Sequence, residues 1–344
     1  MLVCYKTAVS DLPRSVDVAI VGGGFAGMAT AWWLARKMVR DVIVLERESQ
    51  LGAYASGRAA GIGRQLTEDD LSSALTVVGA AHLRAFFPQA WKPTGGLLSF
   101  EDMEIAKGYL SRAQRLSVDV VKMTRRGVTE MWPQLAALQI EAALHVPSDG
   151  IIDIAAFLEA LADGRRVEKR TGVERIEAGG RGARLVTTRG TIEARFVVDA
   201  TGAWAGRTTN DPPLESLKRH VYVLDAKPTA APFVWHIGSR ELYLRADGER
   251  VLVSPCDATP VSAGDQKPDA QGEALLRARL EGSPLADAPI HRAWACQRTF
   301  ARGMQLGRDS TRPWLIWAVG LGGHGATAAS AVGEIVANAV IDGL

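Results

Sequence analysis

The sequence predicts an α/β fold, in which buried strands run into turns and helices. Three segments support this prediction. Residues 16–21 form an apolar strand before a glycine-rich turn and a helix, residues 195–204 form an apolar strand that ends in a turn of small residues, and residues 314–319 form a strand before a second glycine-rich turn and helix. Apolar runs bounded by glycine turns are typical of buried strands. We therefore expect all three to be units of an α/β sheet.

The composition is that of an ordinary globular protein. The 344 residues are 47% hydrophobic and 23% charged, and this length favours about two domains. The net charge of +2, without a basic block, makes a nucleic-acid partner unexpected. Cys4, Cys256 and Cys296 lack metal-ligand spacing, so we expect no metal site and a reducing compartment. Residues 1–14 do not read as a signal peptide and no apolar run is long enough for a membrane span, so we expect a cytoplasmic protein without an integral membrane segment.

The first glycine turn has the spacing of a dinucleotide-binding motif. It covers residues 22–27 and reads Gly-Gly-Gly-Phe-Ala-Gly. Gly22 and Gly24 permit a tight turn and the close approach of a pyrophosphate, and Gly27 lets the next helix lie close to the sheet. The helix N-terminus adds unpaired N–H groups and a positive dipole end. By itself, the same pattern also fits a plain turn between a strand and a helix.

A second apolar strand ends in a carboxylate where such proteins bind a ribose. The strand covers residues 41–46, and Glu46 follows Gly27 by 19 residues. A carboxylate there accepts hydrogen bonds from ribose hydroxyls, which favours an adenine dinucleotide. Arg47 could pair with a 2′-phosphate, but Glu46 would repel one, so NADP is disfavoured. The motif does not separate NAD from FAD.

The second glycine turn favours a flavin. It covers residues 320–325 and precedes a helix. The apolar face of that helix consists of Ala329, Val332, Ile335, Val336 and Val340. Glycine backbone can approach a flat ring closely, and the helix dipole would stabilise negative charge on a reduced flavin. Alternatively, the turn only closes the last unit of the sheet.

Together with two further segments, these motifs resemble the FAD-dependent D-amino-acid oxidase superfamily over essentially the full chain. The motifs are residues 22–27, Glu46 with Arg47, residues 55–60, residues 150–153, residues 199–204 and residues 322–325. Residues 241–245, 251–255 and 294–300 are most similar to the branch that contains D-arginine dehydrogenase, glycine oxidase and monomeric sarcosine oxidase. The resemblance says less about the substrate than about the superfamily.

The resemblance implies two interleaved domains. A Rossmann-type FAD-binding domain would comprise residues 1–75, 141–215 and 305–344, and an α+β substrate domain built on an antiparallel sheet would comprise residues 76–140 and 216–304. The local patterns are consistent with this division, because residues 218–253 read as short alternating strands. Residues 257–272 are expected to form a surface loop, and the acidic residues 68–70 to open a helix.

The resemblance also implies the cofactor-binding residues. FAD would contact Gly22, Gly24, Phe25, Ala26, Gly27, Glu46, Arg47, Ser56, Gly57, Arg58, Ala59, Val173, Ala200, Thr201, Gly202, Trp204, Gly322, Gly323, His324, Gly325, Ala326 and Thr327. Arg58 could instead be an exposed loop arginine. Cys296 stands where monomeric sarcosine oxidase-like proteins bond the flavin covalently. Its flanking residues differ from that motif, so non-covalent FAD is favoured and a link through Cys296 is the alternative.

Four residues would carry the chemistry. Flavin amine oxidation moves a hydride from the carbon that bears the amine to flavin N5, so the protein mainly positions the substrate. By resemblance, Arg298 binds the substrate carboxylate, Tyr243 donates a second hydrogen bond, and Arg219 lies near a position that contacts substrate. His324 would hydrogen-bond the flavin edge or act as an acid-base residue. The alternatives are a surface position for Arg298, a core position for Tyr243 and a local ion pair for Arg219.

The resemblance predicts an enzyme that oxidises the C–N bond of a small amino acid, of the D-amino acid, glycine or N-methyl type, to the imine. The electron acceptor would be oxygen or a quinone. Sarcosine oxidase-like proteins carry a lysine after the strand at 251–254, whereas this chain has no Lys or Arg between Val251 and Gln266, which favours a dehydrogenase. The alternatives are a flavoprotein subunit of a multi-subunit amine dehydrogenase, which would need a partner subunit, and a tailoring oxidase for an unusual amine.

Overall fold

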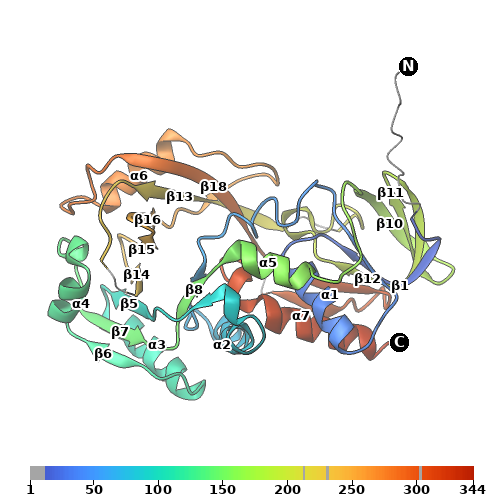
Figure 1. Cartoon of the computed structure of the whole chain (residues 1–344), viewed down its shortest axis with the longest axis horizontal. Helices are drawn as coiled ribbons and strands as arrows, with labels where there is room; N and C mark the ends of the chain where they lie inside the picture. Colours follow the sequence, from blue (N-terminus) through green and yellow to red (C-terminus); the bar gives the residue numbers. More distant parts are fainter. Residues whose placement is uncertain (1–11, 212–213, 230–231, 302–303) are drawn as a thin grey trace.

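The computed structural model describes residues 12–211, 214–229, 232–301 and 304–344 (Figure 1). Cys4 and most of the N-terminal segment considered above lie outside these residues. In the described part of the chain, the strands form sheets of eight, nine and three strands. The eight-stranded sheet lies at one end of the molecule and the nine-stranded sheet at the other, as Figure 1 shows.

The eight-stranded sheet is mixed and is built around β1 and β12. Its strands are β1 (Ser15–Val21), β2 (Val42–Leu45), β9 (Val167–Glu168), β10 (Val173–Gly179), β11 (Gly182–Thr187), β12 (Gly190–Asp199), β19 (Gln305–Arg308) and β20 (Leu315–Val319). β1 pairs in parallel with β2 on one side and with β12 on the other. β12 pairs with β11 along its first half and with β20 along its second half. The predicted α/β fold class is confirmed.

Four parallel strands end at one edge of this sheet. Val21 at the end of β1 lies opposite both Leu45 of β2 and Asp199 of β12, and Asp199 lies opposite Trp317 of β20. The turns that follow these strands therefore meet at the carboxyl edge, where open α/β sheets bind ligands. Both glycine-rich turns and Glu46 follow strands that end here.

Helices cover one face of the eight-stranded sheet. The described part of the chain forms the helices α1 (Phe25–Arg36), α2 (Asp70–Phe86), α3 (Met103–Arg115), α4 (Arg125–Met131), α5 (Ile154–Ala162), α6 (Ala270–Arg279) and α7 (Gly325–Ile341), with 3₁₀ turns η1 (Pro88–Ala90), η2 (Pro133–Leu135) and η3 (Gly202–Trp204). Of these, α1, α2, α5 and α7 cover this face, and α3, α4 and α6 pack against the nine-stranded sheet. Buried apolar residues of α1, α2, α5 and α7 form one core cluster with β1 and β20. α1 and α7 approach so closely that a side chain at Gly333 would strike Ala29. α2 begins at the acidic residues, as expected, and Asp69 accepts from the N–H of Ser72 (2.8 Å).

The nine-stranded sheet is antiparallel except where β5 pairs in parallel with β14. Its strands are β5 (Gly96–Phe100), β6 (Val121–Met123), β7 (Ala142–Val146), β13 (Glu215–Leu224), β14 (Phe233–Ile237), β15 (Leu242–Asp247), β16 (Arg250–Ser254), β17 (Thr259–Pro260) and β18 (Ile290–Phe300). β13 and β18 pair over almost their whole length, which brings residues near 219 beside residues near 296. The short alternating strands expected between 218 and 253 are present.

One expected domain boundary falls inside this sheet. The segment 141–215 was assigned to the FAD-binding domain, but β7 at its start pairs with β5 and β6 in the nine-stranded sheet. β8 (Gly150–Ile152), which follows β7, pairs with β3 (Ile62–Gly63) and β4 (Trp91–Lys92) in the three-stranded sheet. The alternation of polar and apolar residues identifies a strand but not the sheet that it joins. The division into domains stays a prediction.

Within the part of the chain that the structure describes, none of the helices combines the length and the apolar character that a membrane span requires.

Candidate active site

The first glycine turn is packed too tightly for side chains. Gly22 has a φ of +108°, and a Cβ at this position would press on the carbonyl oxygen of Ala200. A Cβ at Gly27 would collide with the carbonyl oxygen of Gly22. At the start of α1, the N–H of Phe25 donates to Oγ of Ser56 (3.0 Å). The turn therefore presents main-chain atoms at the edge of the sheet. At Gly22 and Gly27, only glycine fits.

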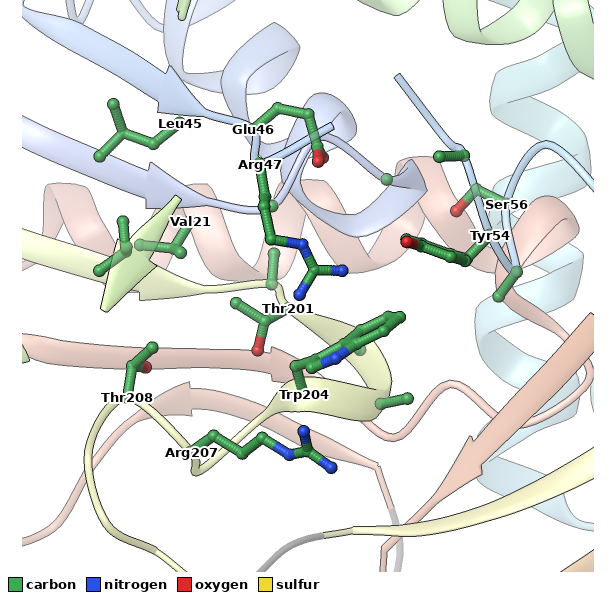
Figure 2. A pocket seen from close by; sticks show the side chains of 18 of the residues that line it. Val21, Leu45, Glu46, Arg47, Tyr54, Ser56, Thr201, Trp204, Arg207 and Thr208 are labelled. Atoms are coloured by element: carbon green, nitrogen blue, oxygen red, sulfur yellow. The ribbon is translucent and has the colours of Figure 1, made fainter. Parts of the chain in front are cut away.

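Glu46 is held beside this turn by main-chain N–H groups. Oε2 accepts from the N–H of Gly23 (2.7 Å), and Oε1 accepts from the N–H of Glu48 (2.7 Å). A carboxylate has about four lone-pair positions, so both oxygens can accept further hydrogen bonds. Glu46 lines a cavity of about 400 Å³ at the carboxyl edge of the sheet (Figure 2). A ligand with neighbouring hydroxyl groups would meet a carboxylate whose orientation is already fixed.

Planar side chains form one wall of this cavity. The guanidinium of Arg47 lies 4.5 Å from the ring centroid of Trp204, and Figure 2 shows it pointing toward that indole. The ring of Tyr54 lies 4.8 Å from Trp204, and its hydroxyl donates to Oε1 of Glu48 (2.8 Å). Flat side chains of this kind suit a flat aromatic ligand such as a base.

A second cavity, of about 170 Å³, adjoins the first. The residues that line both cavities are Gly24, Ala55, Ser56, Ala200, Gly202, Gln297 and Thr299. The second glycine turn forms one side of the new cavity. Gly322 has a φ of +55°, and its N–H donates to the carbonyl of Thr299 in β18 (2.9 Å). A Cβ at Gly323 would lie only 3.5 Å from Nη1 of Arg298, so this turn adjoins the guanidinium directly.

Arg219 and Arg298 enter the second cavity from neighbouring strands. Arg219 of β13 lies opposite Cys296 of β18, and Leu217 lies opposite Arg298, so the two arginines are diagonal neighbours on one face. Both donate to the main-chain oxygen of Asp257, from Nη2 of Arg298 (3.0 Å) and from Nε of Arg219 (3.1 Å). The register of the strands thus places two guanidinium groups at one cavity.

Arg298 is a buried cation without a full set of acceptors. Its Nε finds no hydrogen-bond partner among the described residues. Burial, together with the charge of Arg219, lowers the pKa of Arg298 to about 10. Buried charges are costly unless they are paired, so an anion in the cavity would be strongly favoured.

Tyr243 completes the polar lining of the second cavity. It is buried beside Trp235, with 4.7 Å between the ring centroids. Burial raises the pKa of Tyr243, so its hydroxyl stays protonated at neutral pH and can donate. The described residues that line this cavity include two arginines but no Asp or Glu. The cavity is therefore electrostatically suited to an anionic group.

The chain was compared with models of protein families. Residues 17–339 match the model of the DAO family, described as FAD-dependent oxidoreductase. The chain belongs to this family. The resemblance inferred from the glycine motifs is thereby confirmed over nearly the whole chain.

Several DAO-family proteins are similar in sequence or structure. Glycine oxidase of Geobacillus kaustophilus is 33% identical over 212 residues, which are 56% of this chain and 55% of that protein. Mitochondrial sarcosine dehydrogenase of Mus musculus is 24% identical over 280 residues, which are 73% of this chain and 30% of that protein. The alignments thus span about half or less of the length of these curated relatives.

Two solved structures superpose on almost the whole chain. The crystal structure of glycine oxidase from Geobacillus kaustophilus has a TM-score of 0.83 at 25% identity and covers 96% of this chain and 95% of that one. The structure of L-proline dehydrogenase from P. horikoshii has a TM-score of 0.87 at 22% identity, with coverage of 96% and 95%. The second similarity concerns the fold alone.

The residues present fit the FAD of the DAO family. Most of the predicted FAD-binding residues line the two joined cavities: Gly22, Gly24, Phe25, Ala26, Glu46, Arg47, Ser56, Ala59, Val173, Ala200, Thr201, Gly202, Trp204, Gly322, Gly323, Gly325 and Ala326. Gly22 and Gly27 leave no room for side chains at the first turn, and the carboxylate of Glu46 is already oriented. Their individual roles in FAD binding stay predictions.

Three predicted cofactor residues support the cavities from behind. Gly27 packs on the first glycine turn, as described above. The N–H of Gly57 donates to the carbonyl of Gly52 (2.8 Å), and a Cβ at Gly57 would collide with that carbonyl. Thr327 is buried in α7 and donates from Oγ1 to the carbonyl of Ile62 (3.2 Å). These residues shape the DAO-family site without lining it.

Arg58 also lies outside the lining. Its Nη2 forms an ion pair with Asp265 (2.6 Å), and Nη1 donates to the carbonyls of Gln266 (3.1 Å) and Ala295 (3.2 Å). Arg58 therefore ties the cofactor segment 55–60 to β18 and to the loop before α6. A direct contact between Arg58 and FAD stays a prediction.

His324 directly precedes α7 and does not line either cavity. Its Nε2 lies 3.3 Å from Oε2 of Glu68, whose Oε1 accepts from Nη2 of Arg64 (2.6 Å). The structure thus gives His324 a carboxylate partner that the sequence analysis did not anticipate. The predicted flavin-edge or acid-base role of His324 stays a prediction.

Sequence reasoning missed several residues of the site. Gln297 and Thr299 line both cavities, and they belong to the segment 294–300 on which the family resemblance partly rests, which could have indicated them. Asp257 was placed in an expected surface loop, but it is buried and its carbonyl accepts from both arginines. Nothing in the local sequence signals that a main-chain carbonyl will serve as an acceptor there.

Proposed function

We propose that the chain oxidises the C–N bond of a small amino acid to the imine, with non-covalent FAD as the hydride acceptor. The observation that supports this most is the buried guanidinium of Arg298, which has a free Nε–H among the described residues and lies beside the second glycine turn. A planar guanidinium pairs with a carboxylate through two hydrogen bonds, which fixes distance and angle. Bound FAD supplies the flavin ring that accepts the hydride.

The other polar residues of the second cavity complete the carboxylate site in this proposal. Tyr243 is a protonated hydroxyl in the same lining and donates a hydrogen bond to the carboxylate. Arg219 has two of its nitrogens engaged by main-chain carbonyls, so it contributes mainly positive charge. The names of a glycine oxidase and a sarcosine dehydrogenase among the relatives support an amino-acid substrate of this size.

The lining also favours an uncharged amine. Hydride transfer from the carbon beside nitrogen requires the amine to be neutral. Two positive charges nearby, without a carboxylate among the described lining residues, stabilise the neutral amine relative to the ammonium ion. In our proposal, the ammonium group of the amino acid releases its proton to solvent on binding, and no dedicated base on the described lining residues is needed.

Two further parts of the proposal are the non-covalent binding of FAD and the identity of the electron acceptor. Cys296 lines the second cavity, but burial raises the pKa of its thiol, so the reactive thiolate is disfavoured and we propose non-covalent FAD. The lack of Lys and Arg from Val251 to Gln266 supports a dehydrogenase that passes electrons to a quinone, with oxygen as the alternative acceptor. The D configuration and a cytoplasmic location stay predictions from the sequence.

An anaerobic substrate panel tests the proposal. The FAD-loaded protein is mixed without oxygen with glycine, N-methylglycine and both enantiomers of small amino acids, and the flavin absorbance is followed. At least one member should bleach the flavin, and the matching amine without a carboxylate should not. If every amino acid leaves the absorbance unchanged while simple amines bleach it, the carboxylate-binding assignment is wrong. Adding a quinone or oxygen after reduction then identifies the acceptor.

A further inference from the structure

Three successive main-chain carbonyls after β16 accept hydrogen bonds from arginines. The carbonyl of Pro255 accepts from Nη1 of Arg279, and that of Cys256 accepts from Nη2 of Arg219 (3.3 Å). The carbonyl of Asp257 accepts from both arginines of the second cavity, as described above. Cys256 has a φ of +51°, an unusual conformation for a residue with a side chain. The main-chain carbonyls of the turn 255–257 thus bind three guanidinium groups.

A buried histidine and aspartate pair fixes this turn. Oδ1 of Asp257 accepts from the N–H of His220 (2.7 Å), and Oδ2 lies 2.8 Å from its Nδ1. On the other side of the ring, Nε2 accepts from the N–H of Asp269 (3.2 Å). This arrangement places the imidazole proton on Nδ1, where it is donated to Asp257. The His220 ring also packs on Gly272 of α6, where a Cβ would strike it.

The pair is buried but does not belong to the lining of either cavity. His220 is 2% exposed and Asp257 is 6% exposed. His220 follows Arg219 in β13, so their side chains leave the strand on opposite faces. The side chain of Asp257 therefore reaches His220, while its carbonyl reaches Arg219 and Arg298. The pair thus connects to the second cavity through these two guanidinium groups.

We propose that His220 and Asp257 are positioning residues, which orient Arg298 and Arg219 for carboxylate binding by fixing the carbonyl of Asp257. This inference rests on the proposed function, because it takes the ligand to be a carboxylate. One N–H of Arg298 is directed to the Asp257 carbonyl, so its other N–H groups keep a defined direction toward the cavity. If the carbonyl shifts, the guanidinium loses this restraint, and the bidentate geometry that a carboxylate requires is weakened.

The test compares two substitutions of His220. His220→Asn retains a side-chain N–H near the place of Nδ1 and can still donate to Asp257, whereas His220→Ala cannot. The control is His236→Ala, because His236 is an equally buried histidine that bonds Ser99 and lies against a carboxylate, Glu101 (3.1 Å), outside the cavity lining. Each FAD-loaded variant is titrated with sodium acetate while the flavin absorbance is recorded, and its melting temperature and FAD content are measured.

We expect His220→Ala to raise the Kd for acetate roughly tenfold to a hundredfold, with a matching rise in KM and a smaller change in kcat. His220→Asn should restore most of the affinity. His236→Ala should lower the melting temperature but leave the Kd for acetate unchanged. Equal Kd values for His220→Ala and wild type, or equal losses in His220→Ala and His236→Ala, would overturn the inference.

The same experiment separates this inference from the proposed function. If wild-type protein does not bind acetate at all, the carboxylate site is wrong and both proposals fail. If wild type binds acetate and Arg298→Ala does not, the carboxylate site stands, and the two His220 variants then decide the positioning role. Should His220→Ala fail to fold, the comparison of His220→Asn with Asp257→Asn applies. Asp257→Asn places an amide N–H₂ against the protonated Nδ1 and should weaken acetate binding, whereas His220→Asn should not.

Discussion

The two cavities of this protein differ in how far main-chain atoms and side chains shape them. The first is bounded on one side by main-chain atoms of the glycine turn, with Gly22 and Gly27 packed against carbonyl oxygens. The second depends chiefly on the side chains of Arg219 and Arg298, which come from strands far apart in the sequence. Both donate to the main-chain carbonyl of Asp257. A cofactor site made of backbone tolerates few substitutions, whereas a substrate site made of side chains can change its specificity on the same frame.

The largest expected effect lies in the backbone-built cavity. Gly27→Ala places a Cβ against the carbonyl of Gly22, so the turn must move and the purified protein should contain almost no FAD. Gly108→Ala is the matched control, because a Cβ there meets nothing within 4 Å. Alanine at this exposed position of α3 should leave the FAD content unchanged and stabilise the protein by about 0.5–1 kcal/mol. A Gly27→Ala protein with a full complement of FAD would show that the first glycine turn does not form the FAD site.

The next effect lies in the side-chain-built cavity. Arg298→Ala should keep its FAD but lose about 2–5 kcal/mol of transition-state binding, a fall in kcat/KM of roughly thirtyfold to several thousandfold. Arg292→Ala is the control, since Arg292 is exposed on the same strand and does not line the cavity. Steady-state kinetics with the best amino acid of the panel measures both. Equal kinetics of the two variants would remove Arg298 from the site.

The next expected effect is the pH dependence of carboxylate binding in the second cavity. The pKa of Arg298 is lowered to about 10, so its charge is complete below that pH and is lost above it. Acetate affinity should therefore be level up to about pH 9 and then fall about tenfold for each further unit once the pH exceeds 10. Absorbance titrations at several pH values measure this, with FAD content checked at each. An acetate affinity that stays constant through pH 11 would show that the pKa of Arg298 is not lowered to about 10.

The smallest expected effect concerns Cys296 in the lining of the second cavity. Cys296→Ser should leave FAD content and acid release of FAD unchanged, because the buried thiol is proposed to form no bond with the flavin. Acid precipitation of wild type and variant, followed by absorbance of pellet and supernatant, is the measurement. Yellow colour that stays with the wild-type pellet and leaves the variant pellet would establish a covalent link.

The same contrast explains what the sequence could predict. The strand, glycine turn and helix around Gly22 are local, so together with the two other strand-and-turn segments they predicted the α/β fold class, and with Glu46 they predicted a nucleotide site at this turn. The second cavity depends on the pairing of β13 with β18, which no local pattern reveals. Arg298 and Tyr243 were therefore reached only through a family resemblance. The carbonyl of Asp257 and the partner of His324 were missed, because long-range packing creates both contacts.

A crystal structure of the FAD-loaded protein soaked with acetate tests the carboxylate site most directly. We expect FAD across both cavities, with its ribose hydroxyls at Glu46, and an acetate ion paired with Arg298 beside the second glycine turn. FAD in this position with acetate bound elsewhere, or the Arg298 guanidinium turned away from the ligand, would contradict it.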